Sequence, residues 1–163
     1  MRQSLLRSLA MVLVALAAGP TLAQQPGDEV AFTTLAMDVS SSMAGARDEV
    51  IVDENRLRQV WAEVYRRESD PPPIPQVDFN HRMVVVVSMG QQPTSNAAIV
   101  IKRVSLVRGQ ADGYPLLVIH STETRPGRRC FVLPSASGPI HIIELPFYPD
   151  VTFQRTRKTT SCR

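Results

Sequence analysis

The sequence contains few residues of the types that support metal or thiol chemistry. Among 163 residues there are two cysteines and three histidines, at spacings unlike those of structural zinc sites. None of the eight glycines is followed by the Lys-Ser or Lys-Thr pair of a phosphate-binding loop. No serine stands in the Gly-x-Ser-x-Gly turn of many hydrolases. We therefore predict that the protein has no cofactor and is not an enzyme.

Long apolar runs are also scarce, and the one that stands out lies at the amino terminus. Two arginines precede an uncharged apolar run over residues 9–18, and a short segment over 19–23 follows it. This order is typical of a secretory signal peptide, and the run is about half of the 20 or so apolar residues that a membrane helix needs. No later apolar run is longer than Met83–Val87. We predict that residues 1–23 are a signal peptide, that no membrane span remains after its cleavage, and that the mature chain is periplasmic or secreted.

The excess of positive charge belongs to the two ends of the chain. Lysine and arginine number 18 against 15 aspartates and glutamates, but two arginines lie in the predicted signal peptide and four basic residues lie in the last nine positions. The central part of the chain is therefore slightly acidic. The basic tail, which includes Arg155, Arg157 and Lys158, is typical of a solvated terminus. For an exported domain with an acidic centre, we predict no nucleic-acid partner.

The two cysteines are Cys130 and Cys162. An even number of cysteines favours pairing in an oxidising compartment, so we predict a disulfide between them within one chain. This bridge would close about 32 residues and contribute roughly 3 to 4 kcal/mol to stability. A catalytic thiol is disfavoured, because no neighbouring residue marks either cysteine as an activated nucleophile.

One segment has the pattern of an amphipathic helix. Asp53 is a typical N-cap residue, and the apolar residues after it recur at spacings of three and four, which places them on one face. The prolines of segment 71–75 cannot continue a helix, so we expect it to end near Glu68. Its apolar face consists of Leu57, Val60, Trp61, Val64 and Tyr65.

The remaining segments favour β-structure. Met83–Met89 is short and rich in β-branched residues, which is typical of a strand covered on both faces. Residues 151–153 are expected to form only a short edge strand. One helix and several strands, without a repeating strand–helix alternation, indicate an α+β fold. We predict a single domain over 24–163, with a mainly antiparallel β-sheet, one principal amphipathic helix and a basic C-terminal tail. The other expected strands are 30–37, 49–52, 97–107, 116–121 and 140–145.

A short segment near the start of the mature chain matches a metal-binding motif. Asp38, Ser40 and Ser42 form the Asp-x-Ser-x-Ser pattern of the metal-ion adhesion site in von Willebrand factor A domains. A carboxylate and two hydroxyls offer the oxygen ligands that Mg²⁺ prefers. The strand–helix alternation of such domains does not follow the motif here, and short matches arise by chance. We therefore favour a polar turn, with a divalent-cation-dependent adhesion module as the alternative function.

Two histidines, His120 and His141, stand within apolar strands. If they share a face of one sheet, the two rings could approach each other and form a metal site or an acid–base pair, and the corresponding function would be an exported hydrolase. Single histidines on strands more often satisfy one hydrogen bond with a neighbour. That structural role is the one we favour for both.

Three further stretches are similar in order and spacing to one protein family. They are the strand–helix segment 50–61, the segment Pro75–Thr94 with its Val-Asp-Phe sequence before the buried strand, and the late segment Gly138–Pro146. Together they resemble the carboxy-terminal domain family of the protease-complex subunit PrcB. The similarity covers residues 31–153, nearly the whole mature chain. It differs from the family after Pro93-Thr94, where the family usually has glycines and this chain has Ser95-Asn96.

This resemblance implies a non-enzymatic, exported accessory domain that binds and stabilises a partner protein such as a secreted protease. In such a family Asp78 would cap backbone amides and Phe79 would pack inside, so that both hold the linker onto the sheet. Trp61, on the apolar face of the helix, is expected to be structural as well. Exposed strands could recruit the partner by edge pairing. We therefore expect a protein partner and no catalytic, metal-binding or cofactor-binding residue.

Overall fold

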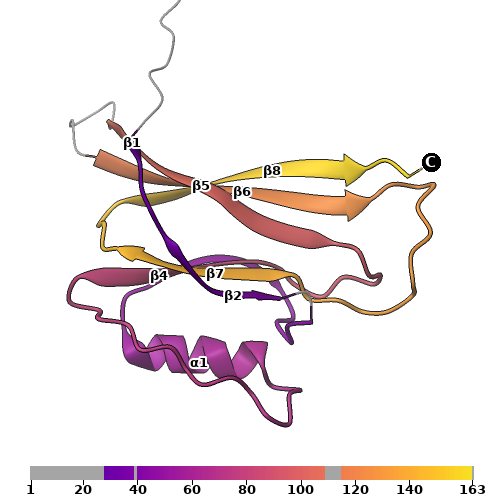
Figure 1. The fold of residues 1–163 in the computed structure, drawn as a ribbon, viewed down its shortest axis with the longest axis horizontal. Coiled ribbons are helices and arrows are strands. Elements are labelled where there is room, and N and C mark those ends of the chain that lie inside the picture. The colour runs from indigo at the N-terminus through magenta and orange to yellow at the C-terminus, as the bar shows by residue number, and fades with distance from the viewer. Residues whose placement is uncertain (1–27, 39, 109–114, 163) are drawn as a thin grey trace, which may run out of the picture.

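The computed structural model describes residues 28–38, 40–108 and 115–162. The predicted signal peptide lies outside these residues. The described chain forms two four-stranded sheets and one helix in three layers, which are an outer sheet, a middle sheet and the helix (Figure 1). Every strand pair between named strands is antiparallel except β6 with β8. The predicted α+β class with mainly antiparallel pairing is therefore confirmed, although the strands divide between two sheets.

The outer sheet has the strand order β1-β5-β6-β8 and the middle sheet has the order β2-β7-β4-β3. The outer sheet consists of β1 (Asp28–Glu29), β5 (Ala98–Arg108), β6 (Pro115–Pro126) and β8 (Val151–Thr160). The middle sheet consists of β2 (Thr33–Asp38), β7 (Ile140–Pro146), β4 (Arg82–Met89) and β3 (Ala46–Ile51).

The middle sheet is covered on both faces, as its central strand β4 shows. Side chains alternate between the two faces of a strand, and residues 83–87 are all fully buried. Val84 and Val86 pack against the helix side, whereas Val85 and Val87 pack against the outer sheet. Two separate apolar cores therefore lie on either side of the middle sheet, and β4 contributes to both. The strand predicted over 83–89 is confirmed as one that is buried on both faces.

The helix α1 (Glu54–Val64) covers the free face of the middle sheet (Figure 1). Its buried residues are Leu57, Val60, Trp61 and Val64, which are four of the five residues of the predicted apolar face. Tyr65 forms the C-cap, and its amide donates to the Trp61 carbonyl at 3.1 Å. The helix thus ends four residues before the predicted end at Glu68, in turns that lead into the proline-rich linker.

Asp53 caps the helix as predicted: its carboxylate accepts a hydrogen bond from the Arg56 amide at 2.9 Å. Replacing Asp53 by alanine leaves this amide without its partner, so the free energy of unfolding is expected to fall by about 1 kcal/mol. Urea denaturation followed by circular dichroism measures this loss. Asp53→Asn keeps a capping oxygen and serves as the control. Equal stability of Asp53→Ala and the unchanged chain would contradict the role of the cap.

Two strands of the outer sheet are much longer than the sequence indicates. β6 continues to Pro126 instead of ending at Ser121, and β8 continues through the basic tail to Thr160 instead of ending at Phe153. The two run parallel along the whole of β8, from the pair Leu117 and Val151 to the pair Pro126 and Thr160. Between β6 and β8 the chain crosses to the middle sheet, where it forms β7, and then returns to the outer sheet. Because of this crossover, β6 and β8 can lie side by side in the parallel direction.

Candidate binding surface

The Asp-x-Ser-x-Ser segment joins the middle sheet to the end of the helix. Asp38 is the last residue of β2, and Ser40 forms a parallel β-bridge with Gly138. The Ser42 amide donates to the Val64 carbonyl at 2.8 Å, while the Ser42 hydroxyl is buried without a hydrogen-bond partner. Within the described residues, no group of three or more His, Cys, Asp or Glu side chains could hold a metal ion. What the structure describes of this turn is a set of backbone contacts between sheet and helix.

The two strand histidines lie in different sheets, so the condition under which they could have formed a common site is not met. His141 is on β7 and is buried between the sheets. Its Nδ1 accepts a hydrogen bond from the Ile101 amide at 2.9 Å, and its Nε2 lies 3.0 Å from the hydroxyl of Thr34. Burial, with a smaller effect of the Lys102 charge, lowers the pKa of His141 to about 4.

His120 occupies the opposite face of the outer sheet. On β6 the neighbouring residues Leu117 and Ile119 are buried in the core between the sheets, so alternation turns His120 away from that core. Its Nε2 lies 2.9 Å from the hydroxyl of Ser105. Burial, followed by the charge of Arg103, lowers the pKa of His120. Each ring therefore has its own hydrogen-bond partners, and the two do not form a common site.

The residues that were expected to hold the linker make local contacts in the structure. Trp61 donates from its indole nitrogen to the Pro72 carbonyl at 2.9 Å, which ties the linker to the helix. Asp78 accepts from the Asn80 amide at 3.1 Å and lies 2.7 Å from Nδ1 of His81. The hydrogen bond to His81, followed by the one from the Asn80 amide, lowers the pKa of Asp78. Phe79 packs, partly buried, against the core beneath the helix.

The basic tail is an edge strand rather than a solvated terminus. The Leu117 amide donates to the Asp150 carbonyl at 2.9 Å, and the Gly127 amide donates to the Thr160 carbonyl at 3.1 Å. The register between these two bonds is unbroken. A strand in a parallel ladder uses alternate residues for one neighbour, so the even-numbered residues of β8 bond to β6. The residues whose N–H and C=O groups point away from β6 are Val151, Phe153, Arg155, Arg157 and Thr159.

This outer side of β8 is unpaired in the part of the chain that the structure describes. β6 is the only described strand that pairs with β8, and β8 lies at the edge of its sheet in Figure 1. Its last five residues are exposed. The result is a ten-residue edge that offers alternating hydrogen-bond donors and acceptors to another extended chain.

One arginine of β8 points inward and holds the two sheets together. The side chain of Arg155 is only 16% exposed. Its guanidinium donates to the carboxylate of Glu123 on β6 at 2.7 Å and also to Asp48 on β3. It further donates to the Ser88 and Arg47 carbonyls at 3.3 Å. Burial lowers the pKa of Arg155, but the hydrogen bonds to Glu123 and Asp48 and the negative charges of both together raise it by more, so the net shift of the pKa is upward.

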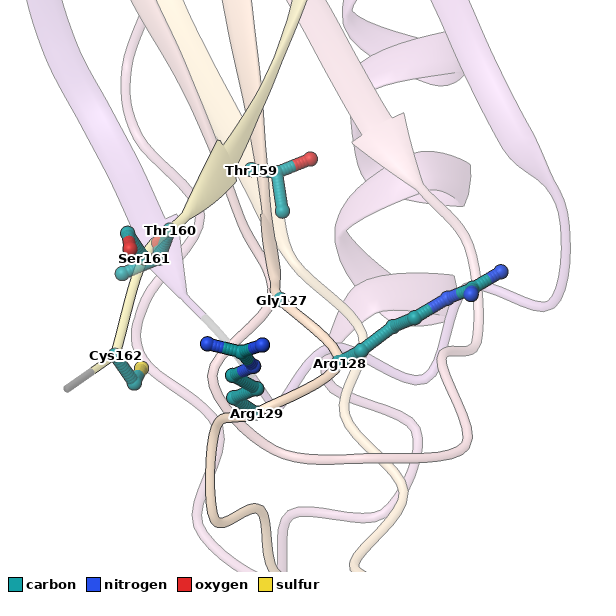
Figure 2. Close-up of a pocket in the computed structure, with 7 residues that line it drawn as sticks. All are labelled: Gly127, Arg128, Arg129, Thr159, Thr160, Ser161 and Cys162. Atoms are coloured by element: carbon teal, nitrogen blue, oxygen red, sulfur yellow. The ribbon is translucent and has the colours of Figure 1, made fainter.

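Near the end of β8, the edge meets a cleft with two arginines. The cleft has a volume of about 570 Å³, and the disulfide between Cys130 and Cys162 lies beside it. In Figure 2 the Arg129 side chain extends into the space between Gly127 and Cys162, whereas Arg128 points to the other side. No acidic residue lines this cleft among the described residues. Its lining consists of Gly127, Arg128, Arg129, Thr159, Thr160, Ser161 and Cys162.

Gly127 and the disulfide shape this end of the molecule. A Cβ atom at position 127 would lie 2.6 Å from the Thr160 carbonyl oxygen, so only glycine lets the end of β8 approach this closely. The predicted bridge between Cys130 and Cys162 is confirmed, with a sequence separation of 32 residues. It links Cys162, which lies two residues beyond the end of β8, to the loop that carries Arg129.

The sequence alone does not predict that these features lie together, although it contains a partial signal for strand β8. The alternation of Val151, Phe153 and Arg155 with polar residues has the period of a half-buried strand. The third inward position is an arginine, however, and its neutralising partners Glu123 and Asp48 are far away in the sequence. The edge, the cleft and the ion cluster therefore depend on tertiary structure.

The fold and this surface define a two-sheet α+β protein with an open, basic strand edge. No match to this chain was found among models of protein families, curated proteins or solved structures. No described helix is long and apolar enough to cross a membrane. What the surface itself offers is backbone pairing with another extended chain beside a positively charged cleft.

Proposed function

We propose that this protein is an exported, non-enzymatic accessory domain that binds an extended segment of a partner protein along the β8 edge. The resemblance to the PrcB carboxy-terminal domain family suggests a secreted protease as the kind of partner, and stabilisation of that partner as the result. Residues 1–23 would direct export and would then be removed.

The disulfide supports the proposed location of the protein outside the cytosol. Disulfides persist in oxidising compartments and are rare in the cytosol, and the bridge between Cys130 and Cys162 contains both cysteines of the chain. Together with the signal-peptide pattern, it favours a periplasmic or secreted protein.

The observation that carries the binding function is the unpaired side of β8. Exposed edges are a hazard, because any extended chain can pair with them, and proteins commonly make such strands short or cover them. Here the edge strand is ten residues long. A partner strand laid along it would gain main-chain hydrogen bonds from the five odd-numbered residues of β8 without any rearrangement of the sheets.

Arg157→Pro tests this edge directly. The Arg157 amide points away from β6, so proline at this position removes one outward donor and places its ring in the path of a partner strand. Arg157→Ala is the matched control, because it removes the same charge and keeps the amide. Tagged forms of the unchanged chain and of both variants would be used to capture proteins from the periplasmic or secreted fraction, after circular dichroism has shown that all three are folded.

The expected result is a protein retained by the unchanged chain and by Arg157→Ala but lost, by at least about tenfold, with Arg157→Pro. The retained protein would be identified by mass spectrometry. If all three forms capture the same proteins in equal amounts, or none captures any, the β8 edge is not a binding site.

A further inference from the structure

We propose that the segment which pairs with β8 is acidic, and that one of its carboxylates binds Arg129 in the cleft at the end of the strand. This inference rests on the proposed strand addition and adds the chemistry of the partner.

Positive charges outnumber negative charges at this edge. Arg157 is 78% exposed, and Lys158, Arg128 and Arg129 are exposed as well. Two carboxylates face β8 from neighbouring strands, Glu123 at 3% exposure and Asp48 at 30% exposure, and both are already bound to Arg155. Arg125 and Arg157 approach the second oxygen of the Glu123 carboxylate, at 3.6 and 3.4 Å. Two acids therefore face three arginines, and with Lys158, Arg128 and Arg129 the surface retains a net positive charge that an acidic segment would balance.

Within the cleft, Arg129 is the cation placed to receive a carboxylate. Its guanidinium lies inside the cleft in Figure 2, and the hydroxyl-bearing residues Thr159, Thr160 and Ser161 line the same space. Arginine binds carboxylates with two parallel hydrogen bonds when the geometry allows. No described acid competes for Arg129, since none lines the cleft. A strand that follows β8 toward Thr160 would bring its own side chains into this space.

The composition of β8 argues against a second copy of this chain as the occupant. β8 reads Val-Thr-Phe-Gln-Arg-Thr-Arg-Lys-Thr-Thr and contains no carboxylate. Pairing two copies edge to edge would supply hydrogen bonds but would add positive charge to positive charge. A partner with aspartate or glutamate at alternate positions supplies both the hydrogen bonds and the opposite charge.

The disulfide links the two walls of the cleft. Cys130 follows Arg129 directly, and its bond to Cys162 holds the Arg129 loop against the residues that follow β8. Cleaving this bond would separate the two walls of the cleft, so we expect reduction to weaken recognition of the carboxylate while the main-chain pairing along β8 remains.

A display library of random 12-residue peptides tests the partner chemistry without knowledge of the natural partner. The oxidised chain would be immobilised and the bound peptides sequenced, with enrichment of aspartate and glutamate expected. The most enriched peptide would then be synthesised, together with a version in which asparagine and glutamine replace its acids. Fluorescence anisotropy would give the dissociation constants for the unchanged chain and for four variants, Arg129→Gln, Arg67→Gln, Arg157→Pro and its charge-matched control Arg157→Ala.

Arg129→Gln and the amide form of the peptide are each expected to weaken binding by about tenfold. Arg67→Gln removes the same charge from an exposed position just beyond the helix, and its affinity should stay within about twofold of the unchanged chain. Arg157→Pro should abolish binding of either peptide.

The other outcomes separate this inference from the proposed function. Peptides without acidic enrichment, or full affinity in Arg129→Gln, would overturn the inference while loss of binding in Arg157→Pro still supports strand addition. Full affinity in Arg157→Pro would overturn both, as would the recovery of no peptide. Inorganic polyphosphate that binds as tightly as the peptide, with the same affinity in Arg157→Pro, would indicate an unspecific anion site and overturn the inference.

Discussion

Replacing Arg155 by alanine is expected to lower the free energy of unfolding by about 3 to 5 kcal/mol. The substitution removes the only guanidinium that bonds to the outer sheet at Glu123 and to the middle sheet at Asp48 among the described residues. It leaves the Glu123 side chain, which is 3% exposed, with ion-pair partners at 3.4 and 3.6 Å only. It also deprives the Ser88 carbonyl of its side-chain donor. Urea denaturation at pH 7 measures the loss.

Two further variants identify the cause. Arg157→Ala removes an exposed arginine that approaches the same carboxylate, and we expect it to cost less than about 1 kcal/mol. Combining Arg155→Met with Glu123→Leu replaces the buried pair by apolar groups of similar volume, and most of the lost stability should return. If Arg155→Ala and Arg157→Ala destabilise the protein equally, the cluster does not hold the sheets together.

The helix and the buried strand were predictable because local pattern and tertiary burial agree for them. Asp53 supplies a cap, and the spacing of Leu57, Val60, Trp61 and Val64 matches the face that is buried. The run Met83–Val87 within β4 has no polar position on either face, so its burial on both sides can be inferred from its composition.

Strand β8 was not predictable, because its local sequence pattern and its tertiary burial do not agree. The inward-facing positions of β8 end with Arg155, and a buried arginine cannot be distinguished from a solvated one without knowledge of Glu123 and Asp48. The length of the strand depends on its parallel pairing with β6, which is made only after the chain has passed through the middle sheet. Such long-range pairing leaves no periodic signal in the tail itself. A basic tail with one aromatic residue therefore suggested a solvated terminus.

The assignment of strands to the two sheets could not be predicted from the sequence either. His120 and His141 both stand in apolar strands, yet β6 belongs to the outer sheet and β7 to the middle sheet. The role of His141 as a hydrogen-bond acceptor depends on a bulge in β5 near Lys102, between Ile101 and Arg103. The Ile101 amide next to this irregularity finds its acceptor on the His141 ring, in the other sheet. Neither the bulge nor the acceptor can be located from the sequence.

This contact makes stability depend on pH. Nδ1 of His141 accepts from the Ile101 amide, so the neutral ring carries its proton on Nε2, which can donate to Thr34. Protonation of Nδ1 would set two N–H groups against each other in a buried site. The folded-state pKa of His141 is lowered to about 4, first by burial and then by the charge of Lys102, whereas an unfolded chain has a histidine pKa of about 6.5.

The direction of the effect follows from these two values. Between about pH 6.5 and pH 4 the unfolded chain binds a proton at position 141 and the folded chain does not, so stability falls as the pH falls. The decrease from this group should reach about 3 kcal/mol at pH 4 and grow no further below it. His141→Asn keeps an acceptor for the Ile101 amide but does not titrate. Its curve of unfolding free energy against pH, measured by urea denaturation from pH 7.5 to 4, should therefore be flatter than that of the unchanged chain by about this amount. The carboxylates common to both chains cancel in this comparison, and parallel curves would show that His141 does not couple folding to pH.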